Sequence, residues 1–335
     1  MNVLFTCAGR RNYLLEYFKE ATKGSGKVIA ADMSPTAPAM ALADVARVVS
    51  DVYAEDYVDQ ILQICLEEKV DLLISLNDLE LPVLSPYRKS FEEAGIRLLI
   101  SEQEVIDICF DKYRTVQFCE DLNLGTPRTY LNLEEAKKAL ESGELSFPVV
   151  VKPRWGSASI GLEFPSDMEE LDLAYRLVTL RTMRSILSEA SKEDAERSVL
   201  IQELIDGTEY GLDILNDFNG KCVQVYVKEK LAMRAGETDK SVLRNEPELE
   251  KLGYRVGNAL GHIGNVDCDM FEKDGKYYLL ELNPRFGGGY PFSQMSGANY
   301  PAAILAWMEN REFDFTTFRK TYDQAFAKCD TLIKV

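Results

Sequence analysis

The segment ELNPR at residues 281–285 contains residue types that could bind a metal ion. Side chains two positions apart in a strand point to the same face, so Glu281 and Asn283 would face one way while Leu280 and Leu282 enter the core. Carboxylate and amide oxygens suit a hard cation that bridges phosphates. We therefore predict a site for a hard cation, of which Mg²⁺ (or Mn²⁺) is an example, on this strand.

Two further residues could complete this site. Pro284 cannot continue a central strand, so the strand should end there and present Arg285 with its guanidinium free for a phosphate or a carboxylate. Asp267 lies on the preceding strand of the same predicted hairpin. It would be a third metal ligand if its side chain reached the face of Glu281.

The turn of this hairpin decides whether Asp267 shares that face. A two-residue turn at Asp274-Gly275 would, without a bulge, point Asp267 away from Glu281. A three-residue loop at residues 273–275 would place the two carboxylates opposite each other. Dipeptide statistics favour the two-residue turn, but a shared metal ion in an unbulged ladder requires the three-residue loop, which we predict.

A second group of residues could bind phosphate. Lys152 ends a run of valines in a predicted strand, where a lysine is unusual without an anionic partner. The loop at residues 154–161 (RWGSASIG) has small residues whose backbone N–H groups could approach a phosphate, although a plain hairpin turn explains it equally well. Lys112, preceded by Asp111, is a further candidate cation.

Residues 202–209 (QELIDGTE) read as the end of a neighbouring strand. A strand that stops at Ile205 leaves backbone groups unpaired, and these could bind the edge of an adenine. Glu209 could accept hydrogen bonds from ribose hydroxyls. A solvated strand end is the alternative interpretation of this segment.

The order of elements predicts the scaffold that would hold these residues. In residues 1–108, almost entirely apolar strands alternate with helices, which is typical of a parallel sheet covered on both faces. The expected strands are at residues 2–8, 27–32, 46–50, 70–76 and 96–101. The expected helices begin near Leu14 and cover residues 56–69 and 81–94.

From residue 109 onward the pattern indicates antiparallel sheets that carry helices, repeated as two α+β lobes. We predict one helix over residues 101–122, then a smaller lobe at about 126–200, a larger lobe at about 201–310 and a tail at 311–335. The smaller lobe should contain a strand–loop–strand unit at 146–164 and a helical stretch at 166–197. The expected strands that follow are at residues 198–205, 209–217 and 221–233, with a hairpin at 266–283.

Composition argues against several classes of function. A net charge of −17 disfavours binding to nucleic acid or to anionic membranes. The single histidine, His262, excludes a multi-histidine metal site, and we interpret it as a structural residue in the turn LGHIG. The seven scattered cysteines form no CxxC pair, and no apolar run is long enough to span a membrane, so we expect a cytoplasmic protein.

The first strand is not followed by a familiar nucleotide motif. Neither GxxxxGK[ST] nor GxGxxG occurs. The turn at residues 7–10 could hold an anion at a helix N-terminus, but an ordinary strand-to-helix turn is the interpretation we favour. A nicotinamide-linked oxidoreductase is therefore a weak alternative, and it also leaves the ELNPR segment unexplained.

The motifs taken together, in their order and spacing, resemble the ATP-grasp superfamily. Within this superfamily, the chain most resembles carboxylate–amine ligases of the carbamoyl-phosphate synthetase large-subunit type. The resemblance covers roughly residues 1–310. It implies a Rossmann-like pre-ATP-grasp α/β domain at 1–108, followed by the two lobes of an ATP-grasp domain at 109–310. The synthetase large subunit holds two synthetase copies and this chain one, so we do not expect it to make carbamoyl phosphate.

Carried over position by position, the resemblance implies a role for each candidate residue. Magnesium would be held by Asp267, Glu281 and Asn283. Arg285 would face the transferred phosphoryl group or the substrate, with Arg234 as a looser match for a further cation. ATP would be bound by Lys112, Lys152, Gly156, Ser157, Ala158, Ser159, Gly161, Glu203, Leu204, Ile205 and Glu209.

The implied reaction is attack of a substrate carboxylate on the γ-phosphoryl group of ATP, followed by transfer of the acyl group to an amine. The expected partners are a small-molecule carboxylate and amine, with no nucleic acid and no membrane, and a homodimer is left open. An ATP-binding regulatory protein without phosphoryl transfer is the main alternative. The acceptor substrates cannot be read from the sequence, because acceptor sites lie on variable loops.

Overall fold

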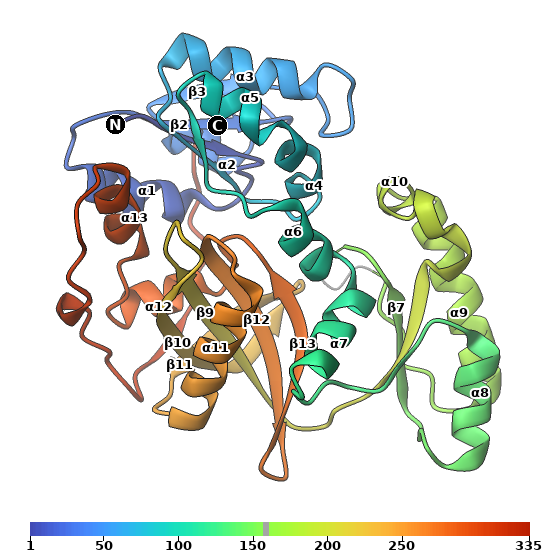
Figure 1. Ribbon diagram of the computed structural model, residues 1–335. Helices are drawn as coiled ribbons and strands as arrows, with labels where there is room; N and C mark the ends of the chain where they lie inside the picture. The colour runs from blue at the N-terminus through green and yellow to red at the C-terminus, as the bar shows by residue number, and fades with distance from the viewer. Residues whose placement is uncertain (157–160) are drawn as a thin grey trace.

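The N-terminal part of the chain is a parallel sheet with strand order β3-β2-β1-β4-β5, shown in blue and teal in Figure 1. The computed structural model describes residues 1–156 and 161–335. The strands are β1 (Val3–Thr6), β2 (Val28–Asp32), β3 (Val45–Val48), β4 (Leu72–Ser75) and β5 (Arg97–Leu98). Every residue of β1, β2 and β4 is buried, which is why these strands read as continuous apolar runs. The predicted parallel sheet is confirmed.

Helices cover this sheet. They are α1 (Asn12–Thr22), α2 (Pro38–Leu42), α3 (Tyr57–Glu68), α4 (Leu81–Leu84) and α5 (Arg88–Glu93), with a 3-10 helix at Ser85–Tyr87. The helix predicted over residues 81–94 is therefore built from three consecutive pieces.

Two helices connect this sheet to the remainder of the chain, where we predicted one. Helix α6 (Gln103–Phe110) ends at Asp111, and α7 (Lys112–Asp121) begins immediately after it. Asp111 has an extended backbone (φ −94°, ψ 105°), and its carboxylate accepts a hydrogen bond of 2.9 Å from the backbone N–H of Tyr113. An N-cap therefore interrupts the predicted helix.

The smaller antiparallel sheet has strand order β6-β8-β7. Its strands are β6 (Thr129–Tyr130), β7 (Val149–Pro153) and β8 (Val199–Glu203). Its helices are α8 (Leu133–Ser142), α9 (Met168–Met183) and α10 (Leu187–Ala190), with a 3-10 helix at Lys192–Arg197. The strand predicted after the glycine-rich loop is reduced to one antiparallel bridge between Val151 and Glu163.

The larger sheet has strand order β13-β12-β9-β10-β11-β14. Its strands are β9 (Thr208–Asn216), β10 (Cys222–Arg234), β11 (Glu237–Leu243), β12 (Gly264–Lys273), β13 (Lys276–Asn283) and β14 (Ala325–Ala327). The last helices are α11 (Pro247–Leu260), α12 (Tyr290–Met295), α13 (Tyr300–Met308) and a 3-10 helix at Phe315–Thr317. Strand β11 and helices α11, α12 and α13 were not predicted from the sequence. The segment predicted as a tail adds β14 to the sheet edge.

The turn between β12 and β13 contradicts the three-residue loop that we predicted. Lys273 pairs with Lys276 across the two-residue turn Asp274-Gly275. Both turn residues have positive φ, +52° and +74°, as a type I′ turn requires. The local preference of the Asp-Gly dipeptide therefore prevails.

A β-bulge places Asp267 on the same strand face as Glu281, although the two-residue turn in an unbulged ladder would have placed them on opposite faces. Beyond the turn Leu279 pairs with Met270, but the next pair is Glu281 with Asp269, so Leu280 is an extra residue on β13. Asp267 pairs with Asn283 further along the ladder.

A shared apolar core joins the N-terminal sheet to the C-terminal helices. Phe5 of β1 and Phe18 of α1 pack in one cluster with Phe286, Tyr290 and Tyr300. The rings of Phe18 and Phe286 meet edge to face, with centroids 6.2 Å apart. Figure 1 accordingly shows α1 beside α13. This packing holds the loop after β1 close to the end of β13.

Candidate active site

A cavity of about 510 Å³ lies where the three sheets meet. The loops after β1 and β4 line one side, β7 another, and the β12–β13 hairpin a third. The structure brings eight of the sixteen predicted site residues together here. Those that line the cavity are Lys112, Lys152, Gly156, Glu209, Asp267, Glu281, Asn283 and Arg285.

One wall of the cavity presents oxygen ligands from the β12–β13 hairpin. Because of the bulge, Asp269 pairs with Glu281 and Asp267 with Asn283, and all four residues line the cavity. The amide nitrogen of Asn283 donates a hydrogen bond of 3.5 Å to the backbone oxygen of Asp267, which leaves the amide oxygen available. The carboxylates of Asp269 and Glu281 and the amide oxygen of Asn283 are a donor set that fits Mg²⁺, whose other ligands are usually water and phosphate.

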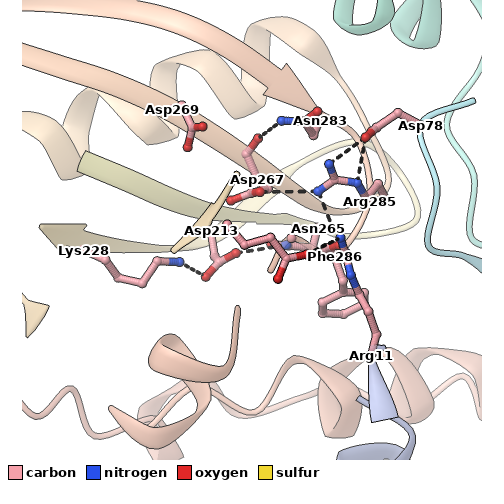
Figure 2. Close-up of polar contacts among 12 residues, drawn as sticks. Arg11, Asp78, Asp213, Lys228, Asn265, Asp267, Asp269, Asn283, Arg285 and Phe286 are labelled. Atoms are coloured by element: carbon pink, nitrogen blue, oxygen red, sulfur yellow. Dashed lines mark hydrogen bonds and ion pairs between the residues drawn. The ribbon is translucent and has the colours of Figure 1, made fainter. Parts of the chain in front are cut away.

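Asp269 was not among the residues predicted from the sequence. The signal that could have identified it is the Asp-x-Asp alternation at 267 and 269, which places both carboxylates on one strand face. Burial raises the pKa of Asp269, against the opposing effect of Lys230. Figure 2 shows Asp269 apart from the contacts that join Asp267 to Arg285.

Lys230, also missed from the sequence, neutralises this acidic wall. It projects from β10, and its ammonium lies 2.7 Å from the Asp269 carboxylate and 2.8 Å from that of Glu209. Burial by itself would lower the pKa of Lys230, but Asp269 and Glu209 raise it above its usual range. Lys230 is thus a cation positioned between the predicted metal-binding and ribose-binding carboxylates.

The opposite wall carries the two lysines predicted to bind phosphate. Lys152 on β7 is 5% exposed, and burial together with the nearby charge of Lys112 lowers its pKa to about 7. The ammonium of Lys112 donates a hydrogen bond to the backbone oxygen of Gly156. Gly156 has φ +96°, and a side chain there would collide with Leu187. The two lysines therefore make a positive, water-poor region that suits an anion.

Arg285 does not have the free guanidinium that we predicted. Its Nη2 donates a hydrogen bond of 2.6 Å to Asp78, and its Nε donates to the same oxygen at 3.1 Å. Its Nη1 lies 3.3 Å from Asp267 (Figure 2). Burial would raise the pKa of Asp267, but Arg285 and nearby lysines outweigh it and hold this pKa below its usual range. Asp267 is therefore paired with an arginine, which weakens its predicted role as a metal ligand.

Gly287 is needed for that pairing, and a substitution can test this. A Cβ atom at Gly287 would lie 2.0 Å from Asp267 Oδ2, so Gly287→Ala must displace Asp267 from Arg285. We expect a loss of about 1–3 kcal/mol in the free energy of unfolding, measured by urea denaturation. Gly289→Ala is the control, because its nearest atom would be 3.7 Å away and its φ is −82°. Equal losses in both variants would contradict this packing role.

Other predicted residues lie elsewhere. Arg234 lies at the end of β10, where its guanidinium is 2.9 Å from Asp239 and 2.7 Å from Asp330, outside the cavity lining. The strand end at Glu203, Leu204 and Ile205 also lies outside that lining. Gly161 has φ +73° and packs near Pro153. The predicted phosphate-loop residues Ser157, Ala158 and Ser159 lie outside the described residues.

Leu280 is not in the core as predicted. As the extra residue of the bulge it is half-buried and lines the cavity, while Leu279 and Leu282 are the buried members of the strand. His262 matches its structural interpretation, because it is fully buried and its Nε2 lies 3.0 Å from the backbone oxygen of Ile214. Burial lowers the pKa of His262 to about 4.

Comparisons with known proteins show which families and folds the chain resembles. The family model described as "PylC-like, N-terminal domain" matches residues 3–99, and that described as "ATP-grasp in the biosynthetic pathway with Ter operon" matches residues 195–327. The biotin carboxylase domain of a *Hydrogenobacter thermophilus* carboxylase, solved with MgADP and bicarbonate, superposes with a TM-score of 0.75 at 17% identity. This superposition covers 97% of this chain and 73% of that one.

The chain has the ATP-grasp fold. An L-amino acid ligase from *Bacillus licheniformis* shares this fold, with a TM-score of 0.70 and 21% identity over 95% of this chain and 78% of that one. In sequence, the chain is 26% identical over 217 residues to the carbamoyl phosphate synthase large chain of *Archaeoglobus fulgidus*. That alignment covers 61% of this ATP-grasp chain but 19% of the relative, so the chain spans about a fifth of that relative's length. No helix in the described part of the chain is long and apolar enough to cross a membrane.

Proposed function

We propose that this ATP-grasp chain is an ATP- and Mg²⁺-dependent carboxylate–amine ligase. The observation that carries the proposal is one cavity with oxygen ligands on one wall and two buried lysines on the other. A nucleoside triphosphate bound between these walls would contact a metal-binding face on one side and a cationic face on the other. Such a site supports phosphoryl transfer, which depends on positioning and charge stabilisation more than on a histidine base.

Asp269, Glu281 and Asn283 are the residues that would hold magnesium. Magnesium held there would supply neutralisation of phosphate charge. Lys152 and Lys112 would bind the phosphate oxygens from the opposite wall. Glu209 would reach the ribose hydroxyls once the nucleotide displaces part of its contact with Lys230.

In the proposed reaction a substrate carboxylate oxygen attacks the γ-phosphorus, the bond to the bridging oxygen breaks, and ADP leaves. The resulting acyl phosphate is attacked at its carbonyl carbon by an amine, which loses a proton as inorganic phosphate departs and the amide forms. Arg285 would orient an oxygen of the substrate or of the transferred group, because Asp78 and Asp267 fix the plane of its guanidinium.

Nucleotide binding is the first test. We expect MgATP, and not NAD, to raise the melting temperature, with about 2.7 kcal/mol of added stability at a ligand concentration a hundredfold above Kd. Differential scanning fluorimetry with ATP, MgATP and NAD measures this directly. An unchanged melting temperature at millimolar MgATP would contradict the proposed binding of a nucleotide.

Catalysis is tested by measuring ADP release across a matrix of carboxylic acids and amines. A ligase should release ADP only when a suitable acid is present, and form an amide when the amine is added. An ATP-binding protein without phosphoryl transfer would show the thermal shift with no ADP release for any pair.

A further inference from the structure

Helix α9 carries apolar side chains on two opposite faces, and within the described part of the chain only one of these faces is packed. Its inner face belongs to the core cluster of the smaller sheet, with side chains from Leu171, Ala174 and Val178. On its outer face, Leu173, Leu177 and Leu180 are 63%, 39% and 42% exposed. Figure 1 shows α9 at the right-hand rim of the molecule, on the outer side of β7. A helix that is apolar on both sides is usually buried on both sides.

The spacing of the outer leucines predicts what kind of surface covers them. Positions 173, 177 and 180 follow an i, i+4, i+7 pattern, which forms one stripe along a helix. Spacings of four and three residues are those of the seam between two coiled helices. Elsewhere exposed apolar side chains such as Leu66 on α3, 57% exposed, do not form such a stripe among the described residues. A second helix is therefore the expected occupant.

The charges of α9 identify that second helix. Its first turns are acidic (Glu169, Glu170, Asp172), its last turn and C-cap are basic (Arg181, Arg184), and Arg176 lies at mid-helix. Within the described chain Asp172 pairs with Lys137 and Arg181 with Glu163, whereas Glu169 and Arg184 form no ion pair there. An antiparallel copy of α9 would bring each acidic end against a basic end. The helix is thus complementary to itself.

We propose that α9 is a self-association surface, which docks antiparallel on α9 of a second copy of this chain around a two-fold axis near Leu177. In this arrangement the leucine stripes interdigitate, and Glu169 of each copy faces Arg184 of the other. Such an interface is isologous and closes as a dimer. The helix has 16 residues and is about 24 Å long, so it buries less than the roughly 800 Å² per partner of a standard interface. The dimer should therefore dissociate in the micromolar range.

Sedimentation velocity over a range of protein concentrations, without nucleotide, tests the stripe. We expect the wild-type chain to show a monomer–dimer equilibrium and Leu177→Glu to be monomeric at every concentration. Leu66→Glu is the matched control and should dimerise like the wild type. Circular dichroism checks that each variant folds. A wild-type chain that stays monomeric at about 100 µM, or a Leu177→Glu variant that dimerises normally, would overturn the proposal.

Charge exchange tests whether the partner is a second copy in the antiparallel orientation. Glu169→Arg and Arg184→Glu should each raise the dimer dissociation constant roughly threefold to tenfold, because like charges then face each other. The double variant should restore the wild-type constant, since both contacts are complementary again. Single variants that weaken the dimer without rescue in the double variant would contradict the antiparallel pairing. None of these measurements uses nucleotide or activity, so their outcome is separate from that of the proposed ligase function.

Discussion

Glu281→Gln and Asp269→Asn should each slow ADP release by a factor on the order of 10² to 10³, with the fold intact. The two carboxylates pair across the β12–β13 ladder and both line the cavity, so removing either charge leaves a proposed Mg²⁺ with one carboxylate ligand. The packing of the hairpin comes from Leu279 and Leu282, which are unchanged. Steady-state ADP release with the acid and amine found by screening measures the effect.

The control for these variants is Glu272→Gln, which makes the same change on the same hairpin outside the cavity. Glu272 accepts a hydrogen bond of 2.7 Å from the backbone N–H of Gly275, and a glutamine can do the same. Its ADP release should match the wild type. Near-normal release by Glu281→Gln would show that the metal assignment is wrong, while circular dichroism and urea denaturation separate a lost site from a lost fold.

The second large effect is uptake of a proton when nucleotide binds. Burial and Lys112 lower the pKa of Lys152 to about 7, so this lysine is mostly neutral in the free protein at pH 8. Anionic phosphates beside it would raise that pKa again, because an opposite charge favours the ammonium. Binding of MgATP at pH 8 should therefore take up close to one proton. The apparent affinity should fall as pH rises above about 7, by at most tenfold per pH unit.

Isothermal titration calorimetry in two buffers of different ionisation enthalpy measures this proton uptake. Lys152→Met should abolish the uptake contributed by this side chain and flatten the pH dependence, at the expense of weaker binding. Lys138→Met, a lysine on helix α8 that does not line the cavity, is the control and should bind like the wild type. Proton uptake that is identical in wild type and Lys152→Met would contradict a role for Lys152 at the phosphates.

The same pKa affects stability in the absence of ligand. In the unfolded chain Lys152 would have a pKa of about 10.4, so between pH 7 and 10 the unfolded state binds more protons than the folded one. The contribution of this lysine to stability therefore rises with pH across that window, is complete above the unfolded pKa and is lost as pH falls to about 7. Burying a charged lysine destabilises the free protein at lower pH, where a bound anion would relieve the cost.

The fold and much of the cavity could be predicted because they depend on local pattern. Apolar strands alternating with helices indicate a parallel sheet, and all residues of β1, β2 and β4 are indeed buried. Lys152, Glu281 and Asn283 stand out in sequence because polar groups beside buried strand positions need partners. The structure brings these three residues to one cavity.

What could not be predicted depends on contacts distant in sequence or on irregular backbone. Asp78 pairs with Arg285, a residue 207 positions away, so the sequence around Arg285 gives no sign that its guanidinium is already bound. Lys230 lies in a charged strand segment whose partners come from other strands. Asp111 interrupts a continuous helical pattern because its own side chain caps the second helix.

The extra residue in β13 makes the two ends of the hairpin independent. The turn end follows the conformational preference of Asp274-Gly275, and the other end aligns Asp269 with Glu281, with Leu280 taking up the difference. In a strand without Leu280 the side chains would still alternate between the two faces, and Leu279 would pair with Met270 and Glu281 with Asp269. Removal of Leu280 would therefore leave the same two carboxylates paired on one face. The binding face thereby tolerates the loss of this residue, whereas the loss of one residue from a regular strand would turn every side chain beyond it to the other face.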